Sequence, residues 1–141
     1  MAGIVATAEI DIAAEPDRVW ETLTDPAAVK QWMFGTDLET DWQVGSPIVW
    51  KGEYEGKSYE DKGEVLVYDA PQRLSVTHFS PTTGQDDVPE NYHTLVYALT
   101  PVDDGTHVTL TQDNNSSEDE AKRSTENWQH ALDGIKAHAE G

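Results

Sequence analysis

The amphipathic pattern at the C-terminal end of the sequence restricts the fold more than any other feature. Steps of four and three residues alternate between its apolar or small side chains, which are Ala121, Thr125, Trp128, Leu132, Ile135 and Ala139. This spacing predicts a helix with one apolar stripe, about 22 residues and about 33 Å long. Ser117 and Glu120 have the spacing of a capping box at its start. Such a stripe needs an apolar surface of similar length to cover it.

A sheet is the only predicted element that can cover this helix. Residues 4–12 alternate between small or apolar and polar side chains, which predicts a first strand with one buried face. Further strand patterns, separated by turn residues, cover 38–42, 47–56, 57–69, 72–80, 91–100 and 106–114. Because the connections are too short for parallel crossovers, we expect an antiparallel meander. We expect the longest connection, the polar segment 80–91, to be mobile.

Two short helices are predicted between the first strand and the meander. Pro16 and Asp17 have the residue types that favour the first turn of a helix, and Asp25 followed by Pro26 repeats the signal. The apolar positions of these helices are Val19, Trp20 and Leu23 in the first, and Val29, Trp32 and Met33 in the second.

Length and charge exclude several classes of protein. The 141 residues predict a single domain over residues 1–141. Twenty-seven acidic against nine basic residues give a formal net charge of −18, which repels nucleic acids and anionic membranes. The absence of cysteine excludes disulfides and thiolate metal sites. With no basic leader and no apolar run of about 20 residues, a cytoplasmic location is expected.

The acidity itself has two interpretations, which remain open at this point. The acidic residues are spread along the whole chain, as in proteins of salt-accumulating microbes. A merely acidic protein of a mesophile would have the same pattern. The two differ in how far salt, by screening self-repulsion, stabilises the fold.

Four segments carry a resemblance to a known family, and together they span nearly the whole chain. They are residues 15–33 (EPDRVWETLTDPAAVKQWM), 51–78 (KGEYEGKSYEDKGEVLVYDAPQRLSVTH), 95–112 (LVYALTPVDDGTHVTLTQ) and 127–140 (NWQHALDGIKAHAE). They resemble the START-like SRPBCC superfamily, nearest to homologues of the activator of the heat-shock protein 90 ATPase. Asn127 stands where family members commonly have a glycine.

The resemblance implies an α+β helix-grip fold. In this fold a curved antiparallel sheet of about seven strands surrounds a long C-terminal helix, with two short helices after the first strand. A cavity between that helix and the sheet can hold a ligand. The resemblance implies three functions from different classes: binding of a small apolar molecule, docking on heat-shock protein 90, or enzymatic action on a small apolar substrate.

The charged residues give no catalytic or metal-binding motif. Glu53, Glu55, Glu60, Asp61 and Glu64 fall in hydrophilic strand ends, where we expect solvated side chains. The five histidines lack the spacing of metal ligands, and the sequence contains no phosphate-binding or dinucleotide-binding loop, so no metal, cofactor or catalytic residue is predicted. His78 alternates with Leu74 and Val76, so the three share one face of a predicted strand, a face that can border the cavity.

The aromatic residues carry the functional prediction. Large rings with a polar atom suit a pocket for hydrophobic or aromatic ligands, although they can also simply fill a core. Alternation does not decide which residues point inward around 65–68 and 94–99, because both faces are apolar. The predicted ligand-binding residues are Trp32, Trp50, Tyr54, Val65, Val67, Val76, His78, Val96 and Trp128.

We therefore predict a protein that binds a small hydrophobic or aromatic ligand between its last helix and its sheet. The alternatives are a co-chaperone-like protein that docks on heat-shock protein 90 and an enzyme that acts in the same cavity. The expected partner is a small apolar molecule, not a nucleic acid or a membrane.

Overall fold

The described part of the chain forms one antiparallel sheet and three α helices. The computed structural model describes residues 3–33, 35–54, 56–80 and 84–141. In chain order the elements are β1 (Ile4–Ile12), α1 (Pro16–Thr24), α2 (Pro26–Trp32), β2 (Asp37–Glu39), β3 (Pro47–Tyr54), β4 (Lys57–Asp69), β5 (Arg73–His78), the 3₁₀ helix η2 (Pro89–Asn91), β6 (His93–Val102), β7 (Gly105–Asn115) and α3 (Glu118–Glu140).

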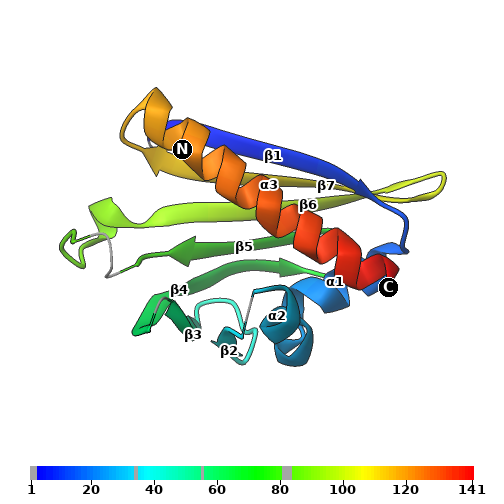
Figure 1. The fold of residues 1–141 in the computed structure, drawn as a ribbon, viewed down its shortest axis with the longest axis horizontal. Helices are drawn as coiled ribbons and strands as arrows, with labels where there is room; N and C mark the ends of the chain where they lie inside the picture. The colour runs from blue at the N-terminus through cyan, green and yellow to red at the C-terminus, as the bar shows by residue number, and fades with distance from the viewer. Residues whose placement is uncertain (1–2, 34, 55, 81–83) are drawn as a thin grey trace.

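The sheet has the strand order β1-β7-β6-β5-β4-β3-β2, so every consecutive pair from β2 to β7 is adjacent and β1 pairs with β7. Figure 1 shows α3 lying diagonally across one face of this sheet, with α1 and α2 near its C-terminal end. This arrangement confirms the predicted helix-grip α+β fold.

The helix α3 begins and packs largely as its sequence pattern predicts. The Ser117 hydroxyl accepts a hydrogen bond from the Glu120 N–H at 3.1 Å, which is one half of a capping box. In the second bond of a capping box, the Glu120 carboxylate would accept from the N–H of Ser117. Here it accepts instead from the N–H of Ser116, at 3.2 Å. Leu132 and Ile135 are fully buried, so the centre of the stripe lies in the core.

The two short helices also begin where predicted and fasten the end of α3. Pro16 is the first residue of α1. The Asp25 carboxylate accepts a hydrogen bond from the Ala27 N–H at 3.2 Å and caps α2. The Arg18 guanidinium donates to the carbonyl oxygens of His138 at 3.1 Å and Ala139 at 3.4 Å. A cation thus meets the negative end of the α3 dipole and ties α1 to α3.

The pairing of β4 with β5 is interrupted at Gly63 and Glu64, between the Val65–Val76 pair and the Lys62–Phe79 bridge. A Cβ at Gly63 would lie 1.7 Å from the carbonyl oxygen of Thr77, so the two backbones approach there as only glycine allows. Beside it, the Glu64 N–H donates to the Thr77 hydroxyl at 2.8 Å instead of to a ladder carbonyl. Lys62 and Phe79 form an isolated bridge beyond the regular pairing with β5. Strand β4 thus pairs regularly with β3 as far as Glu64 and with β5 from Val65 on, with one register shift between Val65 and Val67.

The segment predicted as a strand over 38–42 is shorter than expected. Strand β2 ends at Glu39, because the next residues bond locally. The Trp42 N–H donates to the Thr40 hydroxyl at 3.1 Å, and the Gln43 N–H donates to the Asp41 carboxylate at 2.9 Å. Such side-chain bonds compete with a sheet ladder. They hold Trp42 at a φ of 59°, which turns the chain out of the strand.

The connection 80–91 is described at residue 80 and over 84–91. The residues 81–83, on which part of the predicted mobility falls, lie outside the described chain. The remainder has polar contacts: the Tyr92 hydroxyl donates to the Asp87 carboxylate at 2.6 Å, and Asp87 also forms an ion pair with Lys62. These contacts attach the described part of the connection to β4 and β6.

Candidate functional site

A row of residues across four strands forms the floor of the candidate site. Leu38 of β2 lies opposite Trp50 of β3, and Trp50 lies opposite Asp61 of β4. Asp61 in turn is hydrogen-bonded to His78 of β5. Directly opposite residues in antiparallel strands point to the same face of the sheet. The register therefore places a carboxylate and an imidazole in one line with apolar side chains.

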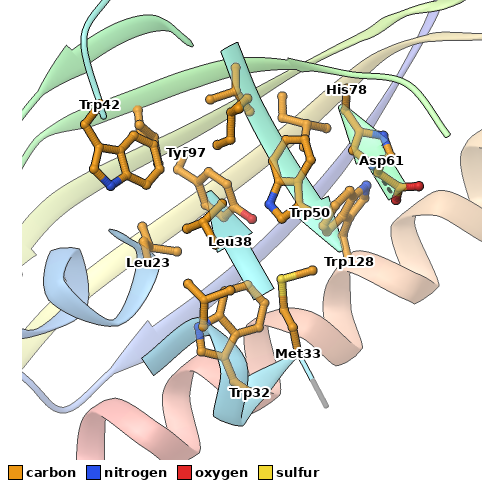
Figure 2. A pocket seen from close by; sticks show the side chains of 15 residues that line it. Leu23, Trp32, Met33, Leu38, Trp42, Trp50, Asp61, His78, Tyr97 and Trp128 are labelled. Atoms are coloured by element: carbon orange, nitrogen blue, oxygen red, sulfur yellow. Dashed lines mark hydrogen bonds and ion pairs between the residues drawn. The ribbon is translucent and has the colours of Figure 1, made fainter. Parts of the chain in front are cut away.

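This row borders an inner cavity of about 50 Å³. This volume exceeds the roughly 10–15 Å³ that a cavity needs to hold one water. Figure 2 shows its side chains, which come from the sheet, from α1 and α2, and from α3. The lining residues are Leu23, Val29, Trp32, Met33, Leu38, Trp42, Ile48, Trp50, Asp61, Leu74, Val76, His78, Leu95, Tyr97 and Trp128.

Two of the tryptophans are held in place by the end of α1. The indole N–H of Trp32 donates to the carbonyl oxygen of Thr22 at 2.8 Å, and that of Trp42 donates to the carbonyl oxygen of Thr24 at 3.1 Å. These bonds satisfy both the indole donors and carbonyls that the helix end leaves without partners. The rings are thereby fixed as walls of the inner cavity.

Asp61 is the acidic side chain of the inner cavity, and His78 is its basic one. The His78 Nε2 lies 3.0 Å from Asp61 Oδ2, a hydrogen bond in which an imidazole N–H donates to the carboxylate. The exposed fractions of the two side chains are only 22% and 17%. The Trp50 and His78 rings lie 5.1 Å apart between centroids. The pair is therefore largely enclosed by aromatic surface.

The second carboxylate oxygen of Asp61 differs from the other polar atoms of the site described so far, because it lacks a hydrogen bond within the described chain. Asp61 Oδ1 is buried, yet it has no hydrogen-bond partner among the residues that the structure describes. Buried polar atoms are almost always paired, because an unpaired one loses its hydration without compensation. Asp61 thus offers a free acceptor at the wall of the cavity.

Tyr97 adds a neutral polar group to the same cavity. Burial raises the pKa of its phenol well above the ordinary value of 10.0, so the hydroxyl stays protonated. In Figure 2 its hydroxyl points toward the side of the cavity that Trp50 and Trp128 line. It can both donate and accept a hydrogen bond.

An outer cavity of about 250 Å³ adjoins the inner one. His78 and Trp128 line both, so they form the boundary between the two. The Trp128 indole N–H donates to the side-chain carbonyl of Gln112, which holds this boundary against β7. The walls of the outer cavity are more polar; they are His78, Phe79, Ser80, Gln85, Asn91, His93, Gln112, Ser124, Asn127, Trp128 and Ala131.

Apart from His78, the inner cavity has an acidic side chain but no basic one. Its lining includes one carboxylate, that of Asp61, and no lysine or arginine. Among the described residues no three His, Asp or Glu side chains gather closely enough to hold a metal ion. The site can therefore offer aromatic faces, a carboxylate acceptor and a phenol.

Five of the nine predicted ligand-binding residues line the inner cavity: Trp32, Trp50, Val76, His78 and Trp128. Val65 is fully buried but does not line it. Tyr54 ends β3, and its side chain lies outside the described residues.

The expected inward orientation of Val67 and Val96 is corrected by the register of the sheet. An irregularity between Val65 and Val67 shifts the pairing of β4 with β5. Val67 lies opposite Ser75, and Ser75 lies opposite Val96, so these three share a face. Their neighbours Leu74, Leu95 and Tyr97 line the cavity on the other face. Val67 and Val96 therefore point away from it.

The expectation that Asp61 is solvated was wrong. Its side chain is mostly buried, whereas Glu53, Glu60 and Glu64 are exposed, and Glu55 lies outside the described residues. Alternation back from the buried Val65 could have indicated this, because it places Gly63 and Asp61 on the inward face. The other wall residues outside the predicted set are Leu23, Val29, Met33, Leu38, Trp42, Ile48, Leu74, Leu95 and Tyr97.

The curved antiparallel sheet, the long C-terminal helix and the two short helices define a START-like helix-grip protein. Within this class the chain belongs to the family described as Activator of Hsp90 ATPase homolog 1-like protein, whose pattern matches residues 13–140. The family resemblance drawn from the sequence is thereby confirmed. None of the described helices is long and apolar enough to span a bilayer.

Solved structures agree with this assignment. A protein of Cytophaga hutchinsonii, known from its solution structure, is 46% identical with a TM-score of 0.85, over 96% of this chain and 93% of that one. The Aha1 dimer from Colwellia psychrerythraea is 21% identical with a TM-score of 0.76, over 97% and 96% of the two chains. A protein of Arthrobacter aurescens is 18% identical with a TM-score of 0.80, over 97% and 86%. No curated protein matches the chain.

Proposed function

We propose that this protein binds a small hydrophobic or aromatic molecule between α3 and the sheet. The observation that carries the proposal is the inner cavity, whose walls converge from β2 to β6 and from all three α helices and include four tryptophans. Ligand sites are typically apolar hollows with a few placed polar groups. Here Asp61, His78 and Tyr97 are those polar groups.

The size of the cavities limits how a ligand would sit. The inner cavity, at about 50 Å³, is smaller than the roughly 300 Å³ at which typical small-molecule sites begin. We therefore place only an apolar portion of the ligand there. The rest extends past His78 and Trp128 into the outer cavity of about 250 Å³.

Native mass spectrometry of freshly purified protein tests the proposal without a choice of ligand. A co-purifying small molecule that dissociates on unfolding would support it. Saturable quenching of tryptophan fluorescence by ethylbenzene and naphthalene tests it with defined probes. If no probe quenches in a saturable way up to its solubility and no small molecule co-purifies, the proposal is overturned.

Two tryptophan variants locate the binding. Trp50→Phe removes an indole from the wall of the inner cavity, whereas Trp20→Phe removes one that lines neither cavity and bonds to the Tyr68 hydroxyl at 3.3 Å. Trp50→Phe should weaken binding by about threefold or more, and Trp20→Phe should leave the dissociation constant unchanged. Equal effects of the two variants would place the ligand elsewhere.

One observation favours a second candidate, an enzyme that acts on a small apolar substrate. The hydrogen-bonded Asp61 and His78 at the cavity wall have the geometry of a carboxylate that orients a general base. If turnover of a bound molecule is detected, His78→Ala should abolish it while binding persists. Turnover that survives in His78→Ala would remove this candidate.

Docking on heat-shock protein 90, the alternative that the family name suggests, has less support from the surface. The exposed large apolar side chains of the described chain are distributed over several elements; they are Ile4, Val44, Leu66, Tyr68, Val88 and Val102. A protein-docking face usually gathers such side chains into one patch. Capture of the purified chaperone on the immobilised protein, at several salt concentrations, tests this alternative.

A further inference from the structure

We infer that the ligand of the inner cavity is an organic ammonium ion with an apolar or aromatic body, and that its N–H donates to Asp61 Oδ1. This inference rests on the proposed function and specifies the chemical class of its ligand. It depends on four features of the described residues, which are a free acceptor, the sign of the local charge, the aromatic walls and the order of the two cavities.

The free acceptor is Asp61 Oδ1. The strand register holds Asp61 between Trp50 and His78, and His78 occupies only the other carboxylate oxygen. Oδ1 is buried without a partner among the described residues, so a donor from a ligand would supply the missing hydrogen bond. A group that itself only accepts, such as a carboxylate, would be repelled there.

The local charge favours a cationic donor over a neutral one. No lysine or arginine lines the inner cavity, so Asp61 has no cationic partner beyond its bond to His78. Any N–H or O–H donor forms a charge-assisted hydrogen bond with a carboxylate, but only a cation adds Coulomb attraction, which is strong where water is largely excluded. The formal net charge of −18 also draws cations toward the protein.

The aromatic walls favour the same class of ligand. Trp50 and Trp128 stand beside Asp61 in Figure 2, and Tyr97 presents its hydroxyl toward the same side. The faces of indole and phenol rings attract cations by their negative electrostatic potential. A carboxylate surrounded by such rings is a suitable environment for an ammonium group.

The positions of the cavities give the orientation of the ligand. His78, the partner of Asp61, lies at the boundary between the inner and outer cavities, while Leu23, Val29 and Trp42 line only the inner cavity. An apolar portion of the ligand would occupy the inner cavity, with the ammonium group at Asp61. Any polar extension would point past Trp128 toward Gln112 and Asn127.

Four probes that share a phenyl ring test the inference on the unaltered protein. They are 2-phenylethylamine, 2-phenylethanol, ethylbenzene and 3-phenylpropionate, compared by tryptophan quenching or calorimetry near neutral pH. We expect the amine to bind about tenfold more tightly than the alcohol, and 3-phenylpropionate to bind most weakly. Because surface attraction is screened by salt, the preference should persist in about 0.5 M KCl.

A pair of isosteric variants then assigns the preference to one carboxylate. Asp61→Asn should reduce the affinity for the amine by about tenfold and change that for ethylbenzene by less than about twofold. Glu60→Gln removes the same charge from the adjacent residue, whose side chain is 59% exposed, and should change neither. Near-UV circular dichroism establishes that both variants are folded, and the four-probe comparison stands without them.

The outcomes separate this inference from the proposed function. If ethylbenzene binds but the amine binds no better than the alcohol, the inference is overturned and the proposed function stands. The same holds if Asp61→Asn keeps the amine preference, or if about 0.5 M KCl removes it, because the preference then comes from the acidic surface. If none of the four probes binds, the inference is overturned, and the proposed function falls with it only if no small molecule co-purifies either.

Discussion

Trp50 and Asp61 lie directly opposite each other on β3 and β4. A large indole and a carboxylate are therefore neighbours on the same face of the sheet. The indole and the His78 ring enclose the carboxylate, and one of its oxygens is left without a partner among the described residues. We expect this arrangement to cost stability, because a buried acceptor without a partner loses its hydration uncompensated. It is the kind of local cost that proteins keep at functional sites.

The cost of the Asp61–His78 pair can be measured by removing both members. An unpaired buried acceptor costs about 1–3 kcal/mol, and replacing an enclosed pair by apolar side chains is often neutral or stabilising. We expect Asp61→Leu/His78→Leu to leave the free energy of unfolding in urea unchanged or to raise it by about 1 kcal/mol. His78→Leu alone should lower it by about 2 kcal/mol, because it leaves both oxygens of Asp61 unpaired. A double variant that is less stable than His78→Leu would contradict this account.

The close approach at Gly63 predicts an intolerance of any side chain. In Gly63→Ala the added Cβ would collide with the carbonyl oxygen of Thr77 at 1.7 Å, so the backbones of β4 and β5 must separate. We expect a loss of about 2–4 kcal/mol in the free energy of unfolding. Gly134→Ala in α3 is the matched control. Its Cβ would lie 3.5 Å from Trp32, which is an ordinary van der Waals contact. That variant should gain about 0.5–1 kcal/mol from helix propensity. Equal effects in urea unfolding would disprove the close approach.

His107 of β7, next to the edge strand β1, predicts a pH dependence of stability. Its ring nitrogens bond to Asp11 at 2.7 Å and Glu9 at 3.0 Å, and these bonds, that to Asp11 foremost, raise the pKa of His107 above 6.5. A raised pKa in the folded state means that the stabilisation is complete below pH 6.5 and is lost as the pH rises through the raised value. We expect the stability difference between the native protein and His107→Gln to be about 0.5 kcal/mol below pH 6.5 and to vanish at higher pH. A difference that grows with pH would have the wrong sign.

The acidic surface predicts that salt stabilises the fold. With a formal net charge of −18, the folded state repels itself, and the ion pairs of the described lysines are exposed and contribute little. We expect the melting temperature to rise between about 0.1 M and about 2 M KCl, most of the rise coming at the lower concentrations if screening alone is responsible. A rise that continues to the highest concentration would favour adaptation to a salt-rich cell. No rise at all would remove that interpretation.

The sequence alone determined the elements of the fold, because helix and strand periods depend only on the order of residues along the chain. The stripe that includes Leu132 and Ile135 predicted α3 and its buried face, and both are as expected. His78 was placed correctly on one face with Val76, since that strand is apolar on this side for its whole length. Five of the nine predicted wall positions followed from such local patterns.

The tertiary structure decided which side chains meet in the site. Val67 and Val96 point away because the irregularity after Val65 changes the pairing of β4, and no pattern within an apolar strand reveals its register. Asp61 meets His78 because adjacent strands bring together residues 17 positions apart in the chain. Local periodicity fixes which residues share a face, whereas the choice of face and the neighbours across it depend on contacts between distant segments.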